Sequence, residues 1–146
     1  MDIDEYVPLT IQWPRYATLQ QVPTCLMLVA GGSLVEVKFD AEDGEIVEVI
    51  LVDVRGVEQI DSPVLGPAVI EEGIPMIGIV HSVEGEAAGG VQIHENGLDV
   101  RFMEGEIARS VGTGGVVLGF STQGELLGVR VKLGPSDVFQ LHEVLH

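Results

Sequence analysis

The stretch from Val116 to Leu133, VVLGFSTQGELLGVRVKL, constrains the fold most strongly. Apolar runs flank a short polar segment that contains a glycine, which is the pattern of two β-strands joined by a tight turn. A similar pattern runs from Leu34 to Val52, LVEVKFDAEDGEIVEVILV. Each stretch carries a phenylalanine, a polar loop, Gly-Glu and two apolar residues in the same order. We therefore expect a chain built from β-hairpins.

The composition agrees with this expectation. The 146 residues include 19 glycines and few aromatic residues, and many valines with many glycines suit short strands and tight turns. Strand patterns at regular spacing predict an all-β fold, a mainly antiparallel sandwich or barrel of about 8–10 strands with a short C-terminal helix. The length fits one β-rich domain over residues 1–146, and the similar hairpins suggest two related β-meander halves, about 24–80 and 91–133.

The sharpest local signal is Asn96-Gly97, which lies between two alternating apolar runs. Such a pair is the strongest short-range indication of a β-hairpin. A two-residue loop at this point pairs Ile93 with Val100 on one face and His94 with Asp99 on the other. Because apolar residues then meet apolar ones, the predicted register is self-consistent.

The last segment has a helical pattern. Gly134-Pro135 ends the preceding strand, and Ser136 is placed to cap a helix from Asp137 to about Leu145. An acidic residue in the first turn also suits the helix dipole.

Charge is the strongest property of the whole chain. It carries 23 acidic and 7 basic residues, a formal net charge of -16. Such a chain repels nucleic-acid phosphates and anionic lipids and attracts basic proteins. No apolar run is long enough to span a bilayer and the N-terminus lacks a signal pattern, so we expect no membrane association and a cytoplasmic location. The lone Cys25 suits a reducing compartment and is expected to be a buried structural thiol.

Acidic residues gather at two places where a partner could bind. Four of them crowd the turn between the strands of the first hairpin, and two more lie in the sequence EGEAAGG. The spacing does not fit a calcium-binding EF-hand loop, and a solvated acidic turn is the alternative. The predicted partner-binding residues are Asp40, Glu42, Asp43, Glu45, Glu84 and Glu86.

The C-terminal sequence HEVLH resembles the metal-binding motif of zincin metalloproteases. That resemblance implies that His142 and His146 bind Zn²⁺ while Glu143 acts as the general base. His146 is the last of the 146 residues, and no residue upstream is marked as a third ligand. An adventitious surface site for Zn²⁺ or Ni²⁺ is a second interpretation of the two histidines. We expect no cofactor.

Three functions are consistent with these features. The first is a small acidic binding or inhibitory protein that masks a basic partner such as a toxin or nuclease, as bacterial immunity proteins do. The second is a structural or homo-oligomeric β-domain without catalysis, suggested by the apolar run Ile46–Val54. The third is a metal-dependent hydrolase using HEVLH. The absence of a catalytic signature favours the first of these functions. It also favours a protein that is not an enzyme.

Overall fold

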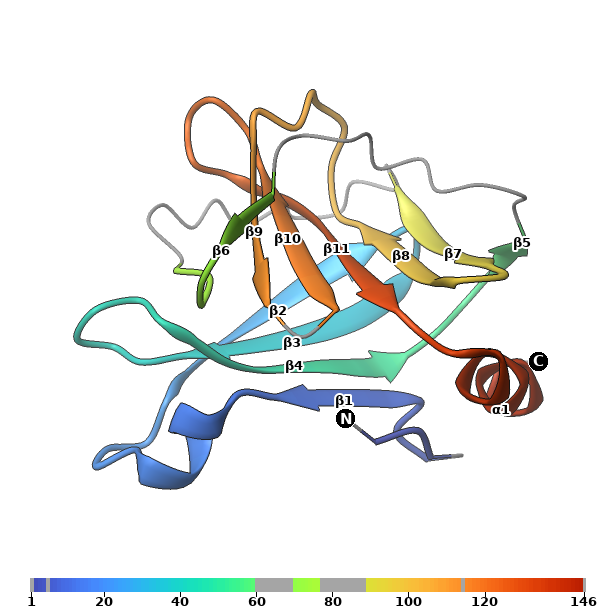
Figure 1. Ribbon diagram of the computed structural model, residues 1–146, viewed down its shortest axis with the longest axis horizontal. Coiled ribbons are helices and arrows are strands. Elements are labelled where there is room, and N and C mark those ends of the chain that lie inside the picture. Colours follow the sequence, from blue (N-terminus) through green and yellow to red (C-terminus); the bar gives the residue numbers. More distant parts are fainter. Residues whose placement is uncertain (1, 5, 60–69, 77–88, 114, 146) are drawn as a thin grey trace.

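A computed structural model describes residues 2–4, 6–59, 70–76, 89–113 and 115–145 of the chain (Figure 1). Within these ranges the chain forms a four-stranded and a seven-stranded β-sheet, a short 3-10 helix and one C-terminal α-helix. The predicted all-β fold with a short C-terminal helix is confirmed. Figure 1 shows the smaller sheet lying across one face of the larger one, and the two do not close into a barrel.

The four-stranded sheet uses the first part of the chain in the order β1-β4-β3-β2, with all neighbours antiparallel. The hairpin predicted over Leu34–Val52 is the β3–β4 pair. Strand β4 lies inside the sheet, between β1 and β3. The strands are β1 (Leu9–Gln12), β2 (Thr24–Ala30), β3 (Ser33–Phe39) and β4 (Ile46–Asp53).

The seven-stranded sheet has the order β5-β7-β8-β11-β10-β9-β6, and the hairpin predicted over Val116–Leu133 is its β10–β11 pair. The two outermost strands are parallel to their neighbours. They are only two and three residues long and bring the described strands to eleven, against the eight to ten expected. The strands are β5 (Glu58–Gln59), β6 (Ile70–Glu72), β7 (Gly90–His94), β8 (Gly97–Arg101), β9 (Arg109–Thr113), β10 (Val116–Phe120) and β11 (Leu126–Lys132).

The main core lies between the two sheets, where the alternate residues of each strand meet. Burial of each large apolar side chain contributes roughly 1.5–3 kcal/mol. Trp13 joins this core at the start of the 3-10 helix η1 (Pro14–Thr18), and its backbone N–H donates to the carbonyl of Val47 at 3.0 Å. Fully buried core side chains include Val35, Val37, Ile93, Leu98, Phe102, Leu118 and Leu141.

The β7–β8 hairpin forms, but its predicted register is wrong. His94 lies opposite Gly97 and Ile93 opposite Leu98, so the two-residue turn is Glu95-Asn96. Gly97 opens β8 because the backbone of β11 approaches it closely: a Cβ there would lie 2.0 Å from the carbonyl oxygen of Val131. The shift keeps each residue on its predicted face, so apolar-to-apolar matching could not detect it.

Helix α1 (Pro135–Val144) begins earlier than predicted, with Gly134 as its N-cap residue and no side-chain cap. Ser136 lies inside the first turn, because Pro135 already has the backbone geometry that a helix start requires. The helix packs through Val138 and Leu141, which are buried, and Leu145 just after it is partly buried against the core. No helix among the described residues is both long and apolar enough to cross a membrane.

Candidate functional site

The acidic turn between β3 and β4 is held by its own carboxylates. The backbone N–H of Glu42 donates to Oδ1 of Asp40 at 2.9 Å, and the N–H of Glu45 donates to Oδ1 of Asp43 at 2.9 Å. Gly44 has a φ of 80°, which closes the turn. These side-chain-to-backbone bonds explain why aspartates occupy the first and fourth positions of the turn.

Arg15 neutralises this turn from a different part of the chain. Helix η1 carries it to the turn, where its guanidinium lies 2.5 Å from Asp40, 2.7 Å from Glu45 and 3.3 Å from Asp43. Desolvation opposes the charged form, but the combined attraction of the three carboxylates outweighs it and raises the pKa of Arg15. No local sequence signal indicates this contact, since Arg15 lies in a segment whose pattern fits a loop or a helical turn equally well.

The four acidic residues of the turn therefore have different surroundings. The side chains of Asp40 and Glu45 are only 12% and 16% exposed and bind Arg15. Glu42 and Asp43 are exposed at the tip of the turn. Asp40, Asp43 and Glu45 thus help to build the turn, while Glu42 and Asp43 remain accessible to solvent. The predicted residues Glu84 and Glu86 lie outside the described residues.

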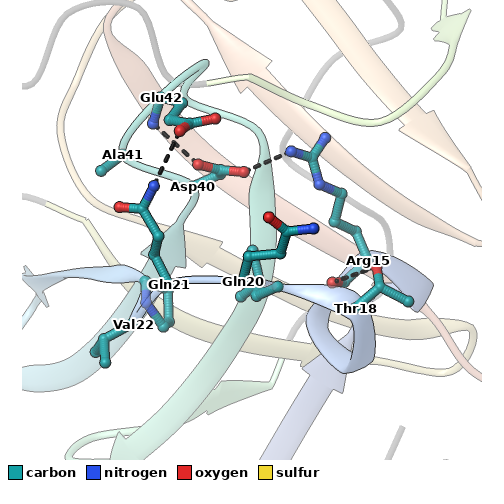
Figure 2. Close-up of a pocket in the computed structure, with 10 residues that line it drawn as sticks. Arg15, Thr18, Gln20, Gln21, Val22, Asp40, Ala41 and Glu42 are labelled. Carbon is teal, nitrogen blue, oxygen red and sulfur yellow. Dashed lines mark hydrogen bonds and ion pairs between the residues drawn. The ribbon is translucent and has the colours of Figure 1, made fainter.

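A cavity of about 360 Å³ opens beside this turn. Figure 2 shows Gln20 and Gln21, on the segment after η1, with their side chains directed toward Asp40 and Glu42. Nε2 of Gln21 donates to Oε1 of Glu42 at 2.9 Å, so the two walls are linked. The lining mixes carboxylates and amides with the apolar side chains of Leu19, Val22 and Pro23. A long side chain with an apolar stem and a cationic end has matching chemistry.

A second cavity, of about 470 Å³, lies at the other end of β4. Most of its lining residues have apolar side chains, but polar atoms make up most of its exposed wall, and Asp53 supplies a carboxylate that pairs with Arg55 at 3.2 Å. The residues come from the N-terminal segment, the end of β4 and the stretch after it, and the end of α1. They are Tyr6, Pro8, Val52, Asp53, Val54, Gly56, Val57, Val144 and Leu145.

Only the first four residues of the HEVLH motif are among the described residues. His142 is exposed on α1, and its Nε2 lies 3.3 Å from Nε2 of Gln59 on β5. The predicted second ligand, His146, lies outside the described residues. Among the residues that are described, no three histidine, cysteine or acidic side chains come together in a way that could hold a metal ion.

His94 and Asp99, which the predicted register places opposite each other on the second face of the hairpin, lie close together with both side chains buried. His94 Nε2 lies 3.6 Å from Asp99 Oδ1, and the same oxygen accepts a hydrogen bond of 3.1 Å from Nε of Arg130. The backbone N–H of Asn96 donates to Nδ1 of His94 at 3.3 Å. The cluster thus ties the β7–β8 turn to β11, and neither of the two cavities reaches it.

The expectation that Cys25 is buried is wrong: it is exposed on β2. The strand lies at the edge of the sheet, and its first two residues, Thr24 and Cys25, are exposed. Desolvation by its neighbours and a hydrogen bond to Glu36 raise the pKa of the thiol. A raised pKa disfavours the thiolate, which argues against a nucleophilic role.

Comparison with known proteins finds neither a matching family model nor a matching curated protein. A function for this chain therefore has to be inferred from its own geometry.

Proposed function

We propose that this chain is an acidic binding module that masks a basic protein partner, using the end of the molecule that carries the β3–β4 turn. The observation that supports it most is how the chain uses its own bases. All seven lie in the described residues, and five of them pair with acidic side chains of the same chain. These five are Arg15, Lys38, Arg55, Arg109 and Arg130.

Most of the bases are thus already paired within the chain, and carboxylates dominate what is left for a partner. Arg101 bonds to the carbonyls of Met103 and Gly105, so it too serves the fold. A positively charged surface would meet a strong field of opposite sign, which accelerates association and disfavours acidic competitors.

The end with the β3–β4 turn has the mixed character of a protein interface. The segment after β6 reaches the start of β4, where Ile46 N–H donates to the carbonyl of Pro75 at 2.9 Å. This brings β6, with exposed Glu71 and Glu72, to the same end as the acidic turn (Figure 1). Large apolar side chains are exposed there as well, Val22 by 90% and Met76 by 52%. An apolar centre with a charged rim is typical of protein–protein contacts.

The test compares two variants that each remove two negative charges. Glu42→Gln with Glu72→Gln changes the proposed surface, whereas Glu58→Gln with Glu95→Gln changes the opposite side, where Figure 1 shows β5 and the β7–β8 turn. Immobilised chain captures partners from a lysate of the organism that encodes it, and the captured protein is then purified and its Kd measured. We expect the first variant to weaken binding about tenfold and the control to change it less than about threefold.

Salt dependence is the second arm of this experiment. At about 0.1 M salt the screening length is near 10 Å, and it falls to about 3 Å at 1 M. Binding of the captured partner should therefore weaken steadily as salt is added. A Kd that is indifferent to salt, or equal effects of the two variants, would refute the proposed function.

A further inference from the structure

In the described part of the chain, three of the four sheet edges are protected against pairing with another chain. Strands β5 and β6 are very short and carry glutamates, both of which discourage strand addition. The outer edge of β1 is occupied by Asp2, whose N–H and carbonyl both bond to the backbone of Thr10 at 2.8 Å. Protection of this kind is what a stable β-protein needs in order to remain monomeric.

Strand β2 is the exception. It has seven residues, TCLMLVA, with no charged residue and no proline. It ends the order β1-β4-β3-β2, and no strand lies on its other side among the described residues. Cys25 and Met27 are exposed, the latter by 48%. An edge of this length and composition is an open template for one more strand.

The β2–β3 turn determines which backbone groups face that edge. Gly31 and Gly32 have φ values of 56° and 92° and form a two-residue hairpin loop, so Ala30 and Ser33 are the closing hydrogen-bonded pair. Bonded and non-bonded pairs then alternate along the ladder. It follows that the N–H and carbonyl groups of the odd-numbered residues, Cys25, Met27 and Val29, point away from β3.

We propose that β2 accepts an extended, basic segment of the partner as a fifth strand of the four-stranded sheet. The inference rests on the proposed function and specifies how the partner binds. Charge complementarity favours a basic segment over a second copy, which would bring the same net charge of -16. The strand also begins next to the acidic cavity: Gln21, three residues before β2, bonds to Glu42. Lysine or arginine side chains of an added strand could therefore reach that carboxylate.

The test uses two fluorescein-labelled heptapeptides of equal charge, one alternating lysine with valine and one of the same sequence that is N-methylated at its central residue and at the next residue. Both satisfy charge complementarity, but the methylated peptide lacks an N–H in either alternating register and cannot form a continuous ladder. Fluorescence anisotropy at low salt should give a Kd at least about tenfold lower for the unmethylated lysine–valine peptide. Equal affinities, or no binding by either peptide, would overturn the inference.

Two variants at one position test the edge itself. Met27→Pro removes an N–H that points outward, which an edge strand tolerates, and Met27→Thr retains that N–H. We expect proline to weaken binding of the lysine–valine peptide about tenfold or more, and threonine to change it less than about twofold. Equal binding by both variants overturns strand addition.

Hydrogen exchange can be measured on the unmodified chain, so this test does not depend on whether a variant folds. Saturating lysine–valine peptide should slow exchange of the Met27 and Val29 amides and leave Leu26 and Leu28 unchanged, since these already bond to β3. A dimer of the chain that Met27→Pro dissociates would assign the edge to a second copy and overturn the basic segment. The proposed masking function is tested independently, through the salt dependence of the Kd of the captured partner. Masking and strand addition can therefore fail separately.

Discussion

Replacing Gly97 by alanine tests the register of β7, β8 and β11 directly. Its φ of 155° lies in a region that is strained for any residue with a Cβ, which costs of order 1–3 kcal/mol. The new Cβ would also lie 2.0 Å from the carbonyl oxygen of Val131, a backbone atom that cannot turn away. Separating β8 from β11 at this point would weaken neighbouring bonds such as Leu133 N–H to Asn96 O, at about 1 kcal/mol each.

Together these effects predict a loss of about 3–5 kcal/mol in the free energy of unfolding for Gly97→Ala. With an unfolding entropy of about 2.1 cal/mol/K per residue, the loss corresponds to a Tm lower by about 10–16 °C. Differential scanning calorimetry and urea unfolding would measure it.

Gly124→Ala is the matched control. Gly124 also has a positive φ, 83°, but a Cβ there would have no atom within 4 Å. Only the backbone strain applies, so we expect a loss of about 1–2 kcal/mol. If Gly97 instead occupied an open turn, as the Asn-Gly signal suggests, the two substitutions would have the same effect. Equal losses would therefore refute the pairing of His94 with Gly97.

Three further predictions concern the core, the acidic turn and the thiol. Leu118→Ala, at a fully buried position, should lower stability by about 2–5 kcal/mol in urea unfolding; a loss below about 1 kcal/mol would contradict its burial. Arg15→Met removes the cation from the turn, so amide exchange at Glu45 should accelerate, and unchanged exchange would show that the ion pairs do not hold the turn. The raised pKa of Cys25 predicts that alkylation, which requires the thiolate, increases with pH through a midpoint above the ordinary value of 9.0. Glu36→Gln should shift that midpoint downward, and an unchanged profile would exclude Glu36 as a cause.

The strands could be predicted well because alternation reports directly which residues face a core. The hairpins over Leu34–Val52 and Val116–Leu133 and the buried face of α1 follow from local patterns alone. The error at Asn96-Gly97 has a physical cause. A two-residue slip of the pairing leaves every side chain on the same face, so the choice depends on the approach of β11, which is distant in sequence.

Sheet order and the candidate site depend on contacts of the same long-range kind. No local pattern distinguishes β11 from β9 as the neighbour of β8. The acidic turn is visible in the sequence, but Arg15 lies 25 residues before Asp40 in a stretch without regular periodicity. The one available signal is the composition: with 23 acidic and only 7 basic residues, a base is expected to lie near a carboxylate, but the composition does not indicate which one. Likewise, the exposure of Cys25 could not be predicted, because an apolar run does not reveal whether its strand is central or at an edge.

The separation of the two sheets along the chain has a consequence for biosynthesis. Strands β1 to β4 end at Asp53, whereas β7 to β11 begin at Gly90. The ribosome therefore releases the whole smaller sheet before the strands that cover its inner face have been made. During that interval Val35, Val37 and Leu51, all buried in the finished molecule, have no partner layer. We expect nascent chains stalled just before Gly90, when β4 has left the exit tunnel, to bind chaperones or aggregate, and to become soluble only after β11 has emerged.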